Sequence, residues 1–156
     1  MRDRDARRRP TTVSALAAVV APAHQGRGLS RVVLRAMRAV AAALGATSLI
    51  APVRPTWEER YPLQPMDRYL AWTTPVGAPF DPWIRTHWRL DAVQLCLMPE
   101  SLTVNGTVAQ WEEWAAMAFP ESGAYVVPGA LQPVAIDRKR DAGRYVEPTV
   151  WMRHPV

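Results

Sequence analysis

The segment Gln25-Gly26-Arg27-Gly28-Leu29-Ser30 has the composition of a loop that binds a phosphorylated ligand. Glycines let the backbone turn tightly and approach a ligand closely. Consecutive backbone N–H groups then point outward, and the start of a following helix adds about half a positive charge. The side chains of Arg27 and Arg31 can add charge-assisted hydrogen bonds. The segment therefore predicts a site for a phosphate or diphosphate.

Two common phosphate-binding motifs do not fit this segment. The P-loop requires Gly-Lys followed by Ser or Thr, which is not found here. The dinucleotide fingerprint requires a third glycine at the position that Arg31 occupies. A different phosphate-binding motif must therefore be considered.

Regular elements are predicted on both sides of the loop. The valine-rich run Val13 to Ala21 ends at Pro22 and predicts a short buried strand. Ser48 to Pro52 predicts a second buried strand, which a crossover would place parallel to the first. Between them, a helix ending at Gly45 is predicted from apolar residues at the spacing of one helix face. These residues are Leu29, Val32, Val33, Ala36, Met37, Val40 and Leu44.

The run Val20 to Ser30 resembles the acetyl-CoA motif of the GNAT superfamily of N-acetyltransferases, Q/R-x-x-G-x-G/A, preceded by a strand ending in V-x-P. Gln25, Gly28 and the spacing match, whereas Ser30 replaces the family's usual glycine or alanine with another small residue. The resemblance implies that acetyl-CoA, or another acyl-CoA, is the co-substrate. The residues implied in its binding are Val20, Gln25, Gly26, Arg27, Gly28, Leu29, Ser30 and Arg31.

The resemblance also implies a reaction. In this family the strand before the loop and the strand after the helix splay apart and form a slot for the pantetheine arm. Backbone groups near Leu16 to Val20 would orient the thioester carbonyl there. An amine of a small molecule or peptide then attacks the thioester directly, without a covalent acyl-enzyme. We therefore expect an acyl-CoA-dependent N-acetyltransferase.

Acid–base residues are less clearly marked. An alkylamine with a pKa of about 10.4 is protonated at neutral pH, so a general base is useful. Glu58, Glu59 and His24 are candidates, with a solvated surface position as the alternative for each. The family often uses a tyrosine to protonate the departing thiolate, and Tyr61 and Tyr69 lie in the corresponding region, with core packing as their alternative.

The remaining reactive or aromatic side chains give weaker indications. His87 and His154 have no metal-ligating partners at a useful spacing, so no metal site is expected. Cys96 is the only cysteine, which excludes an internal disulfide and fits a cytoplasmic protein. Four tryptophans could line an acceptor pocket or pack in a core: Trp83, Trp88, Trp111 and Trp114.

Composition adds limits to the function. The net charge of +5 suits a polyanionic partner, and the arginines of residues 2–9 leave a small basic nucleic-acid-binding protein as an alternative. No apolar run reaches the roughly 20 residues that a membrane helix requires, so no membrane-spanning segment is expected. Nucleic acid is not the expected partner, because Asp3 and Asp5 alternate with those arginines.

The predicted fold class is α/β (α+β), a GNAT-like mixed sheet with a C-terminal strand-rich extension. We expect a disordered charged tail at 1–12, an acetyl-CoA-binding core at 13–72, and an extension at 73–156 packed on the same domain. Elements predicted after the core begin with a helix near Met66 to Ala71, a strand at Ser101 to Val108 and a helix at Val108 to Met117. A hairpin of Gln132 to Asp137 with Arg144 to Met152 follows, and Pro148 predicts an edge or a bulge.

The position of the motif leads to one more expectation. A complete GNAT domain begins with strands and helices that supply much of the acceptor site, whereas the motif here already ends at Ser30. We therefore expect the chain to lack the N-terminal half of that domain. Its sheet would then have an uncovered edge, which a homodimer could cover. A non-catalytic CoA-binding or interaction module, left by the truncation, is an alternative to the enzyme.

Overall fold

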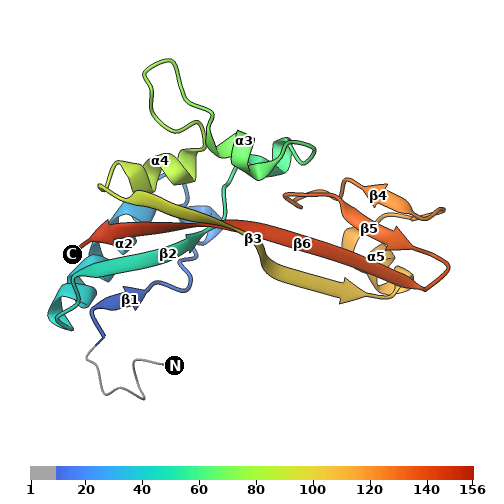
Figure 1. Cartoon of the computed structure of the whole chain (residues 1–156), viewed down its shortest axis with the longest axis horizontal. Helices are drawn as coiled ribbons and strands as arrows, with labels where there is room; N and C mark the ends of the chain where they lie inside the picture. The colour runs from blue at the N-terminus through green and yellow to red at the C-terminus, as the bar shows by residue number, and fades with distance from the viewer. Residues whose placement is uncertain (1–9) are drawn as a thin grey trace. The chain divides into compact units, whose positions relative to one another are not determined.

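The computed structural model describes residues 10–156, so most of the predicted disordered tail at 1–12 lies outside the described residues. In chain order the elements are β1 (Thr12–Ser14), η1 (Pro22–His24), α2 (Leu29–Ala43), β2 (Ser48–Val53), η2 (Glu58–Arg60), α3 (Met66–Leu70), α4 (Pro82–Trp88), β3 (Val93–Gly106), α5 (Val108–Ala115), β4 (Gly123–Tyr125), β5 (Val134–Asp137) and β6 (Ala142–Pro155), as Figure 1 shows.

The strands form a mixed sheet in the order β1-β2-β6-β5-β4, and β3 also pairs with β6. β1 and β2 run parallel, with Thr12 opposite Ser48. β2 pairs with β6 in antiparallel register, and β5 does the same farther along β6. The predicted α/β fold class with a mixed sheet is confirmed.

The first strand is much shorter than the sequence predicts. β1 covers only Thr12–Ser14, and its last contact with β2 is the hydrogen bond from Ala15 N to Ile50 O at 2.8 Å. Beyond that bond the chain leaves β2, and the side chains of Leu16 and Val19 are 83% and 92% exposed. The prediction of a buried strand through Ala21 is therefore wrong, because an apolar run reports hydrophobicity and not the presence of a pairing neighbour.

The predicted helix is confirmed as α2, which ends before Gly45 with its φ of +75°. Its predicted apolar face is buried only in part. Met37 packs with the buried Ala41, whereas Val32 and Val40 are more than half exposed. Leu34 and Ala41 are buried although they lie outside the predicted stripe, so the spacing alone could not identify the face that contacts the sheet.

The later elements largely follow the sequence. The predicted second strand, the helices near 66–71 and 108–117 and the C-terminal hairpin are all present. The strand predicted from Ser101 starts earlier, as part of the 14-residue β3. Helix α4 and strand β4 were not predicted.

Pro148 does not lie in an edge strand, because β6 pairs on both sides. It falls between the residues of β6 that pair with β5 (Ala142 to Arg144) and those that pair with β2 (Val150 to Pro155). Its missing N–H group therefore interrupts neither of these pairings.

The chain forms two compact units, each assembled from separate segments. Unit 1 contains the chain through Val53, residues 84–96 and residues 150–156, whereas unit 2 contains residues 54–83 and 97–149. In unit 1, Ala41 of α2 packs with Ala46 and Leu49 at the start of β2. The predicted tail, core and extension were contiguous ranges, and that division stays a prediction.

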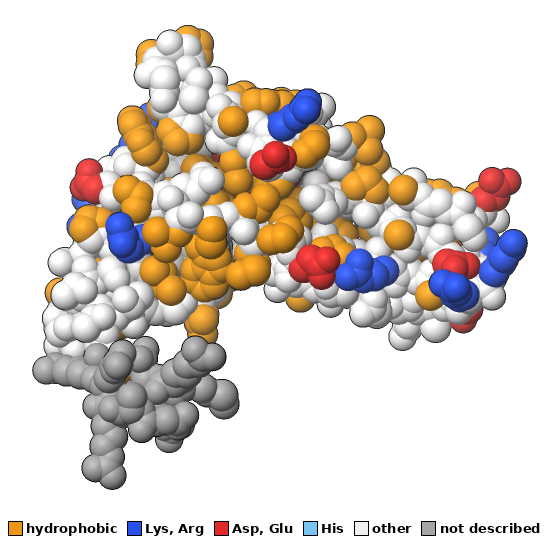
Figure 2. Space-filling model, viewed as in Figure 1, with side chains coloured by type: hydrophobic (Ala, Val, Ile, Leu, Met, Phe, Trp, Pro, Cys, Tyr) orange, Lys and Arg blue, Asp and Glu red, His pale blue; other side chains and the backbone are white. Residues whose placement is uncertain are grey.

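Unit 2 contains clusters of buried side chains. One, around Trp111, Phe119 and Val134, joins α5 to β5 and β6. Another contains Met66, Tyr69 and Leu131, with partly buried aromatic rings around them. Apolar side chains also remain on the surface, as the space-filling view in Figure 2 shows.

Candidate functional site

The loop between β1 and α2 has a backbone that requires glycine. Gly26 and Gly28 have φ angles of +75° and +74°, in the left-handed region that residues with a Cβ rarely adopt. Gln25 closes the loop, because its side-chain Nε2 donates a hydrogen bond of 3.1 Å to the carbonyl oxygen of Val20. The matched glutamine and glycines of the sequence motif thus have identifiable structural roles.

The loop leads directly into the N-terminus of α2. Gly28 is the N-cap residue, and no side chain of the described residues caps the helix. A Cβ built on Gly26 would meet no described atom within 4 Å, so this backbone is open to a ligand. The guanidinium group of Arg31 reaches to 3.3 Å from a Cβ built on Gly28. An uncapped helix start beside a cation fits a diphosphate.

The structure brings the predicted cofactor-binding residues together in one part of unit 1. Gln25, Arg27, Leu29 and Arg31 are exposed, and the remaining residues of the set lie in the same loop or the first turn of α2. Ser30 is half-buried in that turn, so the departure from the family's glycine or alanine is accommodated. The residues present therefore fit the phosphate groups of an acyl-CoA.

The two strands beside the loop separate where a slot was predicted. β1 pairs with β2 only as far as Ser14 and Ile50, and Ala15 makes the last hydrogen bond. Ala51 to Val53 continue to pair with β6 on their other side. Among the described residues, no strand pairs with the β1-facing edge of β2 in this stretch. The chain therefore leaves β2 after Ala15, and a pantetheine slot between two splayed strands stays a prediction.

In unit 2 a fully buried carboxyl group lies in an acidic and aromatic cluster. The side chain of Glu58 is 0% exposed, and neither of its carboxyl oxygens accepts a hydrogen bond from the described residues. Burial, and then the charge of Asp81, raises the pKa of Glu58 to about 7. Glu58 can therefore exchange a proton near neutral pH.

Asp81 is held firmly beside it. The carboxylate of Asp81 accepts hydrogen bonds of 2.8 Å from the backbone N–H of Trp57, the hydroxyl of Tyr69 and the backbone N–H of Trp83. The pKa of Tyr69 is raised well above its usual value, first by burial and then by the hydrogen bond to Asp81. Tyr69 therefore stays protonated, and its proton is directed at Asp81.

The other predicted acid–base candidates have different surroundings. Tyr61 is half-buried, and its ring centroid is 5.0 Å from that of Trp72. Glu59 and His24 are exposed. The structure therefore places Glu58, Tyr61 and Tyr69 in the same region of unit 2, and Asp81 is the functional candidate that sequence reasoning missed. An aspartate directly before Pro82 is a helix-start signal, which could have drawn attention to it.

The four tryptophans do not form one pocket wall. Trp111 is buried in the core of unit 2, and its ring contacts that of Trp114 at a centroid distance of 5.4 Å. Trp83 is half-buried, and Trp88 is exposed. Trp111 therefore packs in a core, which was the alternative to lining an acceptor pocket.

His87 of α4 and His154 of β6 form a buried pair within unit 1. The Nδ1 atom of His87 and the Nε2 atom of His154 are 2.8 Å apart. Burial lowers the pKa of His87 to about 3 and also lowers the pKa of His154. Both rings are therefore neutral at physiological pH. Within residues 10–156, no group of three or more His, Cys, Asp or Glu side chains is arranged to hold a metal ion.

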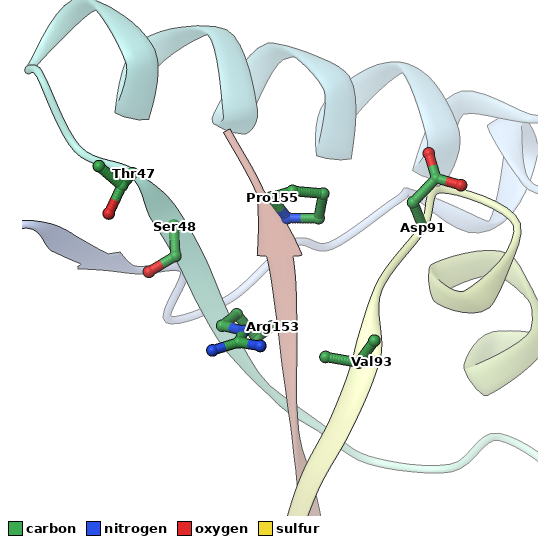
Figure 3. A pocket seen from close by; sticks show the side chains of 6 residues that line it. All are labelled: Thr47, Ser48, Asp91, Val93, Arg153 and Pro155. Atoms are coloured by element: carbon green, nitrogen blue, oxygen red, sulfur yellow. The ribbon is translucent and has the colours of Figure 1, made fainter.

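A cavity of about 330 Å³ lies in unit 1 near the start of β2 and the end of β6, as Figure 3 shows. Its lining residues are Thr47, Ser48, Asp91, Val93, Arg153 and Pro155. The hydroxyl group of Ser48 is already hydrogen-bonded to that of Thr12 at 2.9 Å. The cavity shares no lining residue with the glycine loop.

Across the described part of the chain, no helix is both long and apolar enough to span a membrane.

Comparison with known proteins relates the chain to acetyltransferases. No family model matches the sequence. The arginine N-acetyltransferase avaD of Aspergillus versicolor is 32% identical over 165 aligned residues, which cover 94% of this chain and 57% of that protein. The loading GNATL domain of CurA from Lyngbya majuscula has a TM-score of 0.59 at 18% identity, covering 93% of this chain and 55% of that one.

The chain thus spans little more than half the length of each of these proteins. That it lacks the N-terminal half of a GNAT domain stays a prediction. The structural match establishes the fold, and the sequence match independently connects the chain to an N-acetyltransferase. The resemblance inferred from the glycine loop is confirmed. The chain is therefore similar in sequence to an N-acetyltransferase and shares the fold of a GNAT-like domain.

Proposed function

We propose that this chain binds an acyl-CoA, with acetyl-CoA as the expected donor, and transfers the acyl group to the amine of a cationic acceptor. The observation that carries the proposal is the glycine loop at the uncapped start of α2, where β1 leaves β2. An N-acetyltransferase relative supports the reaction class. Because that relative is named for arginine, an arginine-like acceptor is the expected class.

The residues of the loop would act mainly by binding and orientation. Backbone N–H groups at Gly28 and in the first turn of α2 would hold the diphosphate, with Arg27 and Arg31 adding positive charge. Backbone groups near Leu16 to Val20 would orient the pantetheine amides beside β2. The donor supplies an activated thioester carbonyl. Holding that carbonyl in line with the amine is the chain's expected contribution to the rate.

Removal of the amine proton stays assigned to a group of candidates. Glu58 has a pKa raised to about 7, which suits proton exchange at neutral pH, whereas Glu59 and His24 are exposed on the surface. For the thiolate, Tyr61 is favoured over Tyr69, because the hydroxyl of Tyr69 already donates to Asp81 and is buried. A cytoplasmic location also stays a prediction.

Calorimetric titration with acetyl-CoA tests the donor site. We expect micromolar binding by the wild-type chain and at least a tenfold loss in Gly28→Glu, which places a carboxylate in the proposed diphosphate site. Gly77→Glu is the matched control, because Gly77 also has a φ of +75° and open space around it. Arg27→Ala, which leaves the backbone unchanged, should weaken binding as well.

Four results would count against the proposal. Absence of binding by folded wild-type protein would mean that the motif has another use. Equal losses in Gly28→Glu and Gly77→Glu would mean that the loss reflects general destabilisation. Binding without acyl transfer to any amine would favour the non-catalytic CoA-binding module, and salt-sensitive binding of nucleic acid without acetyl-CoA binding would favour the third alternative.

A further inference from the structure

We propose that Glu58 and the aromatic rings around it form a recognition site for the guanidinium group of the acceptor. This inference rests on the proposed function and names the class of acceptor for it. The site lies wholly within unit 2. The nitrogen that receives the acyl group would be a second group on the acceptor. A carboxylate paired with the guanidinium group could not also take up the amine proton, so Glu58 would act by recognition instead of as the general base.

The first argument is the state of the Glu58 carboxyl group. Both of its oxygens are buried, and neither has a hydrogen-bond partner among the described residues. Leaving a buried polar group unpaired costs roughly 1 to 3 kcal/mol, and more for a charged one. Native proteins rarely retain such groups without a functional reason. The two free oxygens are thus available for a donor that comes from outside the chain.

The second argument is the sign of the charge around it. Asp81 adds a second carboxylate, whose position is fixed by hydrogen bonds from Trp57, Tyr69 and Trp83. The bond from the backbone N–H of Trp57, at 2.8 Å, holds Asp81 against the residue that precedes Glu58, and the charge of Asp81 contributes to the raised pKa of Glu58. Two neighbouring carboxyl groups repel an anion and favour a cation. The guest should therefore carry positive charge.

The third argument is the aromatic shell. Trp57, Tyr61, Tyr69, Trp72 and Phe80 form a connected group of rings with centroid distances between 5.0 and 6.0 Å. Ring faces attract cations, and the planar guanidinium group stacks on them better than a compact ammonium does. A guanidinium group also offers two parallel N–H donors to the two oxygens of one carboxylate.

The chain itself illustrates this preference. The guanidinium carbon of Arg60 lies 4.9 Å from the centroid of the Trp57 ring. One ring of the shell is therefore already in contact with a guanidinium group. Trp57 and Tyr61 are only partly buried, whereas Glu58 is completely buried. We infer that a ligand reaches Glu58 when these outer side chains turn aside.

Proton release gives a sensitive test of this contact. Glu58 must be ionised to pair with a guanidinium, and its pKa of about 7 means that it is mostly protonated at pH 6. Binding at pH 6 should therefore release close to one proton, and binding at pH 9 almost none. The titratable groups that face Glu58 are Asp81, Tyr69 and, through Tyr69, Tyr61. Titration in buffers of different ionisation enthalpy measures the number of protons.

The experiment compares L-arginine with L-citrulline, which has the same shape without the charge. We expect L-arginine to bind the wild-type chain at least tenfold more tightly than L-citrulline. Glu58→Gln should lose at least tenfold in affinity for L-arginine together with the proton release. Glu59→Gln, which changes the exposed neighbour, should keep both. In turnover with acetyl-CoA, Glu58→Gln should raise KM for L-arginine more than it lowers kcat.

The outcomes separate this inference from the proposed function. If L-arginine and L-citrulline bind equally, if Glu58→Gln binds L-arginine like the wild type, or if folded protein binds neither, the guanidinium site is wrong. Titration of the same sample with acetyl-CoA then shows whether the donor site survives. Binding of L-arginine without acetyl-CoA would leave the guanidinium site in place and overturn the acyltransferase.

Discussion

Burying an ionisable side chain makes the stability of a fold depend on pH, and Glu58 and His87 do so in opposite directions. Burial raises the pKa of Glu58 from 4.5 to about 7, so the folded state holds this proton more tightly than the unfolded state. The contribution of Glu58 to the free energy of unfolding is therefore fully present below pH 4.5 and is lost as the pH rises through 7. Burial lowers the pKa of His87 from 6.5 to about 3, which reverses the sign.

Replacing Glu58 with Gln should remove one of these slopes. The wild-type chain should lose on the order of 2 kcal/mol of unfolding free energy between pH 5 and pH 8 through Glu58, because the ionised carboxyl is disfavoured in its buried position. The difference in unfolding free energy between Glu58→Gln and the wild type should therefore change by about this amount from pH 5 to pH 8, as urea denaturation at both pH values measures. The unfolding free energy of Glu59→Gln should depend on pH as that of the wild type does. The same dependence in Glu58→Gln would contradict a raised pKa of Glu58.

The histidine pair should make unit 1 sensitive to acid. Between pH 7 and pH 5 the unfolded chain binds a proton at residue 87 that the folded chain does not, which costs about 2 kcal/mol. His87→Gln should show a smaller loss of stability over this interval than the wild type, as followed by chemical denaturation. His24→Gln is the control, because His24 is exposed in the loop. Identical acid sensitivity in both variants would disprove the role of the pair.

At the scale of elements, Gly143 shows how tightly α5 packs on the hairpin. Gly143 of β6 lies opposite Ile136 of β5, and a Cβ at this position would overlap the ring of Trp111. We expect Gly143→Ala to lower the unfolding free energy by about 1 to 3 kcal/mol, because a packed core does not accommodate an added methyl group. Guanidinium chloride denaturation measures this change.

Gly123→Ala is the matched control for that prediction. Gly123 is also a strand residue, but a Cβ there would meet the ring of Tyr125 at the ordinary contact distance of 3.9 Å. This variant should change stability by less than about 0.5 kcal/mol, in the range of surface substitutions. Equal effects in both variants would mean that the loss of glycine itself, and not the overlap with Trp111, determines the result.

Elements that depend on neighbouring residues were the ones that the sequence predicted well. The glycine loop needs left-handed backbone angles at Gly26 and Gly28, and α2 stops where Gly45 follows it. Both signals are local, so they can be read without knowing the fold. The loop and the helix that follows it were therefore located correctly, whereas the strand before them ends at Ser14 and the ligand contacts stay predictions.

Features that depend on distant residues could not be predicted in the same way. The length of β1 is set by where it leaves β2, and the buried side of α2 is set by the sheet beneath Leu34 and Ala41. The carboxyl group of Glu58 acquires its raised pKa from burial and from Asp81, which is far away in sequence. No motif or spacing predicts that Glu58 and Asp81 interact, so the sequence left Glu58 as one of several candidates.

At the scale of the whole molecule, the two proposed ligands address different units. The glycine loop belongs to unit 1, whereas Glu58 and its aromatic shell belong to unit 2. A ligand that binds only the folded state adds about 2.7 kcal/mol at a hundredfold excess over its Kd. This stabilisation should be greatest in the unit that contains the binding residues.

Hydrogen exchange followed by mass spectrometry can measure this difference. Acetyl-CoA should slow exchange in α2 and the preceding loop, and L-arginine should slow it between Trp57 and Asp81, because each ligand contacts those amides or their side chains. Gly28→Glu should lose the first effect and keep the second. Equal slowing of the entire chain by either ligand would show that the two units open together, contrary to this prediction.

The discontinuous segments of the two units have a consequence for how this protein can change over evolutionary time. The chain passes from one unit to the other after Val53, Trp83, Cys96 and Thr149. Neither unit can therefore be exchanged alone through one breakpoint, since every breakpoint within the chain separates the first segment of unit 1 from its last. By contrast, α5, β4 and β5 form an uninterrupted stretch between β3 and β6, within unit 2. Gene segments of different length can be exchanged there without disturbing the order of strands that carries the glycine loop.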